Sequence, residues 1–270
     1  MTASRTARSA GFNVTAMALA VLFLFPLVWS GWSSVKGQPG SAQASGYGIG
    51  NYRYLTHYGE GVVTYLVNST AVTAMTVLGT LLVSALGGYG FARFTFPGRN
   101  LLFLATLAIL MVPYATILIP LYVLLDRLGL QNSLVGLSLV FIMFQLPFAL
   151  FMMRNSFEAV PRELEEAALV DGCSTFTALR WVLLRAVRPG LVTVALFAFL
   201  ASWNDFFAPL ILISDASKFT MPVAVYSMQQ RSFGAIDYGA LEAGVVVMAI
   251  PCLLLQRHYV RGFMTGALRG

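Results

Sequence analysis

The 270-residue sequence predicts an all-α, polytopic membrane protein with six transmembrane helices. Three observations lead to this fold class. Hydrophobic residues make up 58% of the chain and charged residues only 10%, whereas soluble domains average about 45–50% and about 25%. The charged residues are also unevenly spaced, so that long stretches carry none. A soluble domain needs more surface charge, and a disordered chain needs less hydrophobicity, so both are excluded.

Six apolar stretches supply the predicted spans. Four have no charged residue, and each exceeds the ~20 residues that a helix needs to cross a ~30 Å hydrocarbon core. In chain order the six are 9–35, 61–92, 100–125, 128–153, 189–214 with only Asp205, and 238–256 with only Glu242. We expect helices, because a helix satisfies its own backbone in lipid and because barrel strands alternate apolar and polar residues.

The first span is either a cleaved signal peptide or a retained anchor. Arg5 and Arg8 precede it, as in both kinds of segment. Its apolar run is roughly twice the 7–15 residues of a signal-peptide core. No convincing cleavage site of small residues precedes Trp29. These features favour a retained anchor helix.

Basic residues predict the orientation. Six helices place both termini on one side, together with loops 93–99 and 154–188, and that side holds twelve arginines against five basic residues on the other. The twelve are Arg5, Arg8, Arg93, Arg99, Arg154, Arg162, Arg180, Arg185, Arg188, Arg257, Arg261 and Arg269. Basic loops stay in the cytoplasm, so we expect cytoplasmic termini. The net charge of +6 then reflects topology and indicates no nucleic-acid partner.

The residues of common catalytic sites are missing. The only lysines are Lys36 and Lys218, and neither follows the glycine-rich pattern of an ATP-binding P-loop. The only histidines, His57 and His258, fall on opposite sides of the predicted membrane and cannot share a metal. No Gly-x-Ser-x-Gly elbow occurs. We therefore predict no catalytic residue, metal or cofactor in this chain.

The long inner loop, 158–188, predicts a helical elbow. Residues 162–170 are good helix formers, and Gly172 stands where a helix commonly ends in a left-handed residue. Ser174 or Thr175 can then cap a second short helix. The two helices meet near Gly172.

The first helix of this elbow is acidic, which separates two interpretations. Amphipathic helices on a membrane surface usually carry Lys and Arg on their polar face. This helix instead carries Glu163, Glu165 and Glu166, followed by Asp171, against a single Arg162. An anionic inner leaflet would repel it, which favours a protein partner over a lipid surface. The basic residues of the loop come later, nearer the membrane: Arg180, Arg185 and Arg188.

Several motifs of the chain occur together in one known family. Glu166-Ala167-Ala168 followed by Gly172 resembles the EAA loop of ABC-importer permeases. The other motifs keep the family's order and spacing: Asn68-Ser69, Tyr89-Gly90-Phe91-Ala92-Arg93-Phe94, Phe96-Pro97-Gly98-Arg99, Leu146-Pro147-Phe148, Pro161-Arg162-Glu163-Leu164-Glu165-Glu166, Trp203-Asn204-Asp205-Phe206 and the tail from Gln256. Over residues 51–270 the sequence is similar to the carbohydrate branch of these permeases and to the smaller permease of maltose-type importers.

Two positions depart from the family pattern. The family loop usually ends in Leu-Pro, where this chain has Leu184-Arg185. Loss of that helix breaker leads us to expect a straighter run from the second loop helix into the fifth span. The tail ends in Arg269-Gly270 in place of Lys-Gly, which keeps the charge.

The resemblance implies a type I ABC-importer permease fold with a cytoplasmic coupling helix. Residues 1–60 would hold an N-terminal cytoplasmic segment, the first helix and an extracytoplasmic loop, and residues 61–270 the importer transmembrane domain. The coupling helix of this family docks on a separate ATP-hydrolysing subunit, which binds the ATP and Mg. Carried over, the contact would be made by Glu165, Glu166, Ala167, Ala168, Asp171 and Gly172.

The resemblance also implies the partners and the substrate class. They are a second permease subunit, two copies of the ATP-binding subunit and an extracytoplasmic solute-binding protein, at a bacterial inner membrane. The expected substrate is a carbohydrate. A non-sugar solute of the same family, such as a glycerophosphodiester or a polyol, stays open as the alternative.

Polar and aromatic residues within the spans are candidates for the translocation pathway, because polar groups are costly in lipid unless they are buried or face a cavity. They are Asn68, Tyr89, Gln145, Trp203, Asn204 and Asp205. Helix packing or a helix-end position is the alternative for each. Asp205 lies ~24 Å along a helix from Pro189, toward the outer end. Four glycines are expected to permit close helix packing: Gly79, Gly87, Gly88 and Gly90.

Two other function classes compete with an importer subunit. A secondary transporter or channel would need ionisable residues at the midplane or an inverted repeat, and the sequence has neither. The acidic elbow would also have no purpose in such a transporter. A membrane scaffold without transport is the second alternative, and co-purification of an ATPase stimulated by binding protein and sugar would distinguish the three classes.

Overall fold

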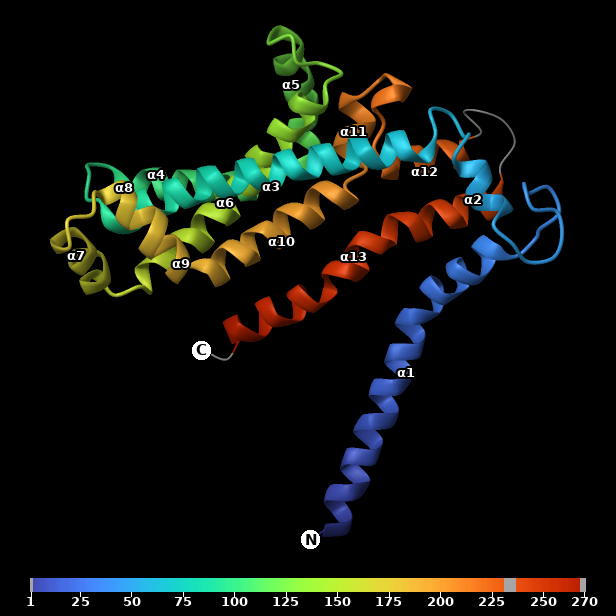
Figure 1. The fold of residues 1–270 in the computed structure, drawn as a ribbon, viewed down its shortest axis with the longest axis horizontal. Helices are drawn as coiled ribbons and strands as arrows, with labels where there is room; N and C mark the ends of the chain where they lie inside the picture. The colour runs from blue at the N-terminus through green and yellow to red at the C-terminus, as the bar shows by residue number, and fades with distance from the viewer. Residues whose placement is uncertain (1, 231–236, 268–270) are drawn as a thin grey trace. The chain divides into compact units, whose positions relative to one another are not determined.

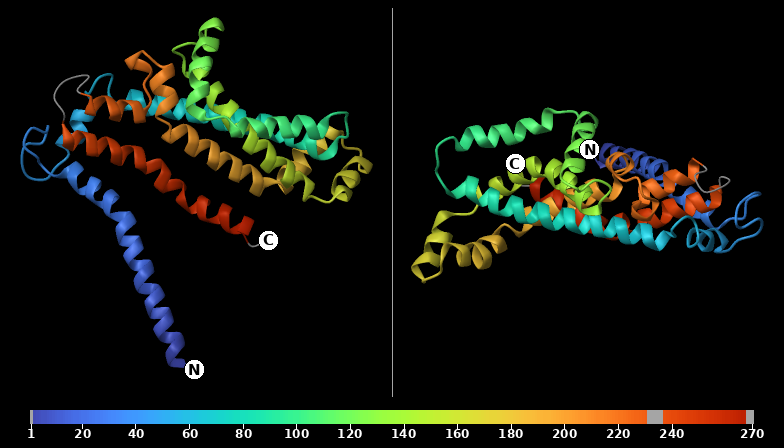
Figure 2. Two further views of the ribbon diagram at one scale, coloured as in Figure 1. Left: turned by 180° about the vertical axis from the view of Figure 1, so that it is seen from behind. Right: turned by 90° about the horizontal axis from the view of Figure 1, so that it is seen from above.

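The computed structural model describes the backbone of residues 2–230 and 237–267. These residues form helices and turns without a β-strand, apart from an isolated bridge between Lys36 and Tyr47. The predicted all-α class is therefore confirmed. The chain divides into two compact units, Met1–Val63 with Ala224–Pro251 and Thr64–Val223 with Cys252–Gly270. Figures 1 and 2 show the course of the chain in three views.

Four described helices contain a stretch long and apolar enough to cross a membrane. They are α1 (Thr2–Val35), α3 (Val62–Arg93), α6 (Leu134–Glu158) and α13 (Tyr238–Ala267). Two bent helix pairs are also long and apolar enough to cross a membrane, if the two helices of each pair are taken together. Arg99–Met111 and Tyr114–Arg127 meet at 105°, and Thr175–Ala186 and Arg188–Asn204 meet at 78°. If each pair is one span, the described residues supply up to six spans, the number that the sequence predicts, although the second pair covers Thr175–Asn204 and not 189–214.

The third and fifth predicted spans are interrupted. Pro113 separates α4 (Arg99–Ala108) and a 3₁₀ turn (Ile109–Met111) from α5 (Tyr114–Arg127). Val112 before it is extended, as expected for a residue preceding proline. The stretch 189–214 is not one helix either, because α10 (Arg188–Asn204) ends at Asp205 and α11 (Phe207–Leu212) follows.

The first unit contains α1, the short helix α2 (Gly50–Leu55), most of α12 (Met221–Gln229) and the beginning of α13. Its buried core consists of Leu55, Tyr58, Met228, Ala240, Leu241 and Ala243. Asn51 is fully buried and donates to the Ser34 carbonyl at 2.9 Å. Asp237 caps α13 by accepting from the Ala240 N–H at 2.9 Å.

Close packing in the second unit joins α3 to α6. A Cβ at Gly79 would lie 2.4 Å from Ile142 Cδ1, and one at Gly88 would lie 2.6 Å from Met153 Cβ. The expected role of Gly79 and Gly88 is therefore confirmed, as it is for Gly87 against Leu150. It is wrong for Gly90, where a Cβ would meet nothing within 4 Å.

The predicted elbow is present between α6 and α10. It contains α7 (Arg162–Val170), α8 (Thr175–Ala178), a π-helical turn (Leu179–Leu183) and α9 (Leu184–Ala186). Gly172 has φ +87°, which confirms the predicted left-handed turn. Ser174 is the capping residue, and its Oγ accepts from the Thr177 N–H at 3.3 Å.

The expected effect of Arg185 is wrong. Helical backbone does run through Arg185, but the chain then bends by 78° at Val187. The reason is Pro189, which occupies the first turn of α10 and disfavours continuation of the preceding helix. The helix is therefore still broken, but two residues after Arg185.

Candidate functional site: the helical elbow

The elbow packs on one end of the second unit. A buried cluster joins side chains of α3, α6, the π-helical turn and α10. Its members are Tyr89, Ala92, Ala149, Met153, Phe157, Leu179, Leu183, Val187 and Val194. Leu183 and Phe157 are completely buried. The second half of the elbow is thus part of the helix bundle and not a flexible loop.

The first half of the elbow is tied to α3 by a charged joint. Arg93 Nε lies 3.1 Å from Glu165 Oε2, and both side chains are largely buried, at 7% and 13% exposure. Tyr89 Oη donates to the other oxygen of Glu165. Arg93 Nη2 also donates to the Val160 carbonyl at 2.8 Å, just before α7 begins. We call Tyr89, Arg93 and Glu165 the α3–α7 joint.

The opposite face of α7 and the turn after it are open. Of the six residues expected to contact an ATPase, Glu166, Ala167, Asp171 and Gly172 are exposed. Ala168 is buried. Glu165 lies in the joint, so the structure gives it an internal partner that its place in the acidic run did not indicate.

Apolar side chains stand beside these exposed acids. Val170 is 87% exposed and Phe176 is 65% exposed, and Leu164 and Leu169 on α7 are exposed as well. A large apolar side chain so open to solvent at the tip of an anchored turn indicates a surface that another molecule covers. We call Glu166, Val170, Gly172 and Phe176 the elbow tip. The sequence alone did not indicate that these apolar side chains would remain uncovered.

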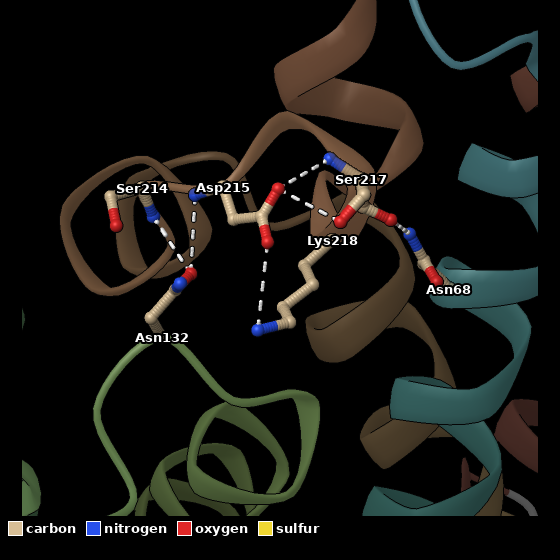
Figure 3. A network of polar contacts seen from close by, with 6 residues as sticks. All are labelled: Asn68, Asn132, Ser214, Asp215, Ser217 and Lys218. Atoms are coloured by element: carbon tan, nitrogen blue, oxygen red, sulfur yellow. Dashed lines mark hydrogen bonds and ion pairs between the residues drawn. The ribbon is translucent and has the colours of Figure 1, made fainter.

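Asn68, a candidate pathway residue, holds a turn at the other end of α3. Its Nδ2 donates to the Ser217 and Phe219 carbonyls at 2.8 and 3.0 Å. Asn132 approaches the same segment from the α5–α6 turn, and its Oδ1 accepts from the Ser214 and Asp215 N–H groups (Figure 3). Asn132 has φ +51°, a conformation that asparagine tolerates better than most residues.

Asp215 organises this turn from within. It accepts from the Ser217 hydroxyl at 2.8 Å and the Ser217 N–H at 3.0 Å, and Lys218 Nζ lies 3.7 Å away (Figure 3). These hydrogen bonds lower the pKa of Asp215 below its ordinary value, and the bond from the Ser217 hydroxyl has the largest effect. We call Asn68, Asn132 and the turn 214–219 the amide clasp.

Asp205 connects the two interrupted spans. Its Oδ2 accepts from Tyr114 Oη at 2.9 Å, and its Oδ1 accepts from the Ala208 N–H at 2.8 Å. Tyr114 is the first residue of α5 after the break, and Asp205 is the residue at which α10 ends. Irregular backbone in a membrane protein needs such internal partners. The sequence drew attention to Asp205 but not to Tyr114.

The remaining candidate pathway residues differ in accessibility. Trp203 is buried and stacks on Phe199 with ring centroids 5.7 Å apart. Asn204 is exposed, and its Nδ2 donates to Leu200 of its own helix at 3.0 Å. Gln145 is half-buried in α6. Within residues 12–230 and 237–255, no three His, Cys, Asp or Glu side chains gather as a metal site.

These features define a polytopic membrane protein whose helix bundle carries one anchored elbow with an uncovered, acidic and apolar tip. The chain belongs to the family of binding-protein-dependent transport system inner membrane components, which residues 84–260 match. It is 33% identical to the diacetylchitobiose uptake system permease protein NgcG of Streptomyces coelicolor, over 93% of this chain and 85% of that one. It is 34% identical to the trehalose transport system permease protein SugB of Mycobacterium tuberculosis, over 93% and 92%.

A solved structure has the same fold. It is a crystal structure of a bacterial ABC transporter involved in the import of the acidic polysaccharide alginate, with a TM-score of 0.80 and 19% identity. The similarity covers 96% of this chain and 97% of that one. An importer permease fold is therefore shown.

Proposed function

We propose that this chain is the transmembrane permease subunit of an ATP-driven, binding-protein-dependent carbohydrate importer, and that the elbow tip docks on an ATP-hydrolysing partner. One observation carries the proposal: an uncovered tip, with Val170 at 87% exposure, stands on an elbow that the α3–α7 joint fixes to a membrane span. The tip supplies a contact, and the joint supplies a way to transmit movement.

The chemistry of the tip suits a partner with a basic, partly apolar groove. Covering a Val or Phe side chain contributes about 1.5–3 kcal/mol by removing apolar area from water. The exposed carboxylates of Glu166 and Asp171 would add charge complementarity and speed association. ATP and Mg belong to that partner, because this sequence has no P-loop lysine.

The joint explains how docking could act on the pathway. α7 is not continuous with α3 in sequence, yet Glu165 binds Arg93 and Tyr89 at the end of α3. A displacement of α7 is therefore passed to α3 as well as to α6 and α10, between which the elbow lies. A buried ion pair resists separation, since opening it leaves an uncompensated charge.

The assembly and orientation follow from the family and the charge distribution. Twelve arginines on one predicted side support a cytoplasmic location for both termini and the elbow. A second permease would complete the pathway, two ATPase subunits would bind the two elbows, and a solute-binding protein would deliver substrate from outside. The membrane is then a bacterial inner membrane.

A carbohydrate substrate is supported by relatives that transport diacetylchitobiose and trehalose. Gln145 and Asn204 are amide groups able to hydrogen-bond sugar hydroxyls, and their accessibility fits this role better than that of buried Trp203. A glycerophosphodiester or a polyol offers similar hydroxyls and stays the alternative. Binding measurements on the solute-binding protein, with both solute classes, decide between them.

Two tip variants test the docking. Glu166→Lys reverses one charge and Val170→Asp places a charge in the apolar contact, and each should abolish co-purification of the ATPase and solute uptake. Thr95→Lys, an exposed change in the other inner loop, is the matched control. If both tip variants retain the ATPase and import solute at the wild-type rate, the docking assignment is wrong.

A further inference from the structure

A basic and aromatic patch lies at the base of the elbow, away from its tip. Trp181 is 52% exposed, and two guanidinium groups lie over its ring. The Arg180 guanidinium carbon is 5.3 Å from the ring centroid, and that of Arg185 is 5.2 Å from it. Both arginines are exposed. We call these three residues the Arg–Trp patch.

The patch stands on a rigid base. Leu179 and Leu183 come from the same π-helical turn and are 5% and 0% exposed. They belong to the buried cluster that joins α3, α6 and α10. One side of the turn is therefore fixed in the bundle while the other presents Trp181. Single π-helical turns are frequent at functional sites.

No described acidic side chain forms an ion pair with the guanidinium groups of the patch. Among the side chains described, the three ion pairs are Arg93–Glu165, Arg154–Glu158 and Lys218–Asp215. None involves Arg180, Arg185 or the exposed Arg188 that follows. The stretch 174–190 contains these three arginines and no acidic residue. The loop thus separates its charges, with acids on α7 and bases next to α10.

The position of the patch indicates what covers it. α10 begins at Arg188, so the patch directly precedes a membrane-crossing segment. Tryptophan is enriched at the membrane–water interface. The cytoplasmic leaflet is anionic and attracts basic residues beside a span. Guanidinium binds phosphate through two parallel N–H···O bonds, and the Trp181 ring holds both groups in place for such contacts.

We propose that the Arg–Trp patch binds the phosphate of an anionic phospholipid in the inner leaflet. This inference rests on the proposed orientation, with the elbow in the cytoplasm. A bound lipid would hold the base of the elbow at the membrane surface while the tip follows its partner. The acidic tip and the basic patch then contact different molecules.

The test is lipid retention on the assembled importer, measured by native mass spectrometry after reconstitution in equal phosphatidylglycerol and phosphatidylcholine. Wild type should retain phosphatidylglycerol in preference. Each of Arg180→Gln and Arg185→Gln should lower that affinity about fivefold, the effect of one basic residue near an anionic surface. Arg162→Gln removes the same charge from exposed α7 and should leave retention unchanged.

Two further measurements identify the ligand and the geometry. Arg185→Lys keeps the charge but loses the planar, two-bond contact, and should give an intermediate affinity. Excess inorganic phosphate should not displace the lipid; displacement would identify a soluble anion as the ligand and overturn the proposal. Equal retention of the two lipids by wild type, or full retention by the Arg180→Gln/Arg185→Gln double variant, would also overturn it.

The result is independent of the docking proposal. If Glu166→Lys and Val170→Asp leave the ATPase bound while the patch variants lose phosphatidylglycerol, the docking assignment fails and the lipid site stands. If the tip variants release the ATPase while the patch variants keep the lipid, the lipid site fails and the docking assignment stands.

Discussion

The two ends of α3 are fixed by different chemistry. At one end Arg93 and Tyr89 bind the largely buried carboxylate of Glu165 in the elbow. At the other, Asn68 binds backbone carbonyls of the turn 214–219 through an uncharged amide. Asn68 and Arg93 lie about 38 Å apart on one helix. α3 therefore connects the elbow to the opposite end of the unit.

The contacts at the two ends of α3 therefore differ in how they are broken. Opening the charged joint leaves a buried ion without a partner, so its loss is abrupt. In the amide clasp, Asn68 and Asn132 hold the turn by several neutral hydrogen bonds, each with a net contribution of about 1 kcal/mol. The turn can therefore loosen one bond at a time. We therefore expect α3 to move together with the elbow, whereas the turn 214–219 can move partly independently of α3.

The largest effect is expected from Arg93→Gln. It leaves Glu165 buried without its counter-ion and should destabilise the unit by about 3 kcal/mol. Thermal melting of the purified importer measures the loss, and solute uptake should fall with it. Arg154→Gln is the matched control, since its ion pair with Glu158 lies within one helix and is more exposed, at 18% and 43%.

The double variant Arg93→Gln/Glu165→Gln sharpens this result. Removing both charges should restore much of the melting temperature, because no uncompensated ion remains. Uptake should stay low if the charged joint transmits movement. Equal melting of Arg93→Gln and Arg154→Gln would show that the joint carries no more energy than a surface pair.

The next effect is that of Asn68→Ala. It removes two hydrogen bonds and leaves the Ser217 and Phe219 carbonyls without this donor, which should cost about 2 kcal/mol. Hydrogen exchange of residues 214–221 should accelerate, while exchange in α7 stays as in wild type. Asn204→Ala should leave this turn unchanged, because the Asn204 amide contacts Leu200 of its own helix and Cys252 of α13, and not the turn. Faster exchange in α7 would mean that the two ends are not held separately.

A smaller effect is expected at Gly172, where the chain turns between α7 and α8. Gly172 has φ +87°, so Gly172→Ala should cost about 1 kcal/mol in backbone strain although the site has room for a methyl group. Gly172→Asn should be milder, since asparagine adopts this conformation more readily. Gly90→Ala offers a control of opposite sign, because Gly90 is helical and open and alanine favours helix. Melting temperatures of the three variants decide this ranking.

Sequence reasoning found features set by local chemistry and missed those set by distant contacts. The absence of charge located the spans, and Gly172 with Ser174 located the elbow, since turns and caps depend on a few neighbours. The joint was not visible, because Glu165 is one of three glutamates on α7 and only packing against α3 selects it. The Tyr114–Asp205 bond likewise joins residues far apart in the chain. Arg185 stands where the family usually has proline, and this difference alone predicted a straighter chain. The bend at Val187 depends on Pro189, which follows it.

The smallest effect concerns pH and belongs to the amide clasp. Hydrogen bonds from Ser217 hold the pKa of Asp215 below its ordinary value of 3.8. A lowered pKa in the folded state means that these bonds stabilise the turn fully above that value, and that the contribution is lost as the pH falls through the folded pKa. Exchange of the Ser217 and Lys218 amides should therefore rise, relative to Asp215→Asn at the same pH, only in strongly acidic solution. A rise that begins near neutral pH would assign the effect to another group, and no rise would mean that the Ser217 contacts do not hold the turn.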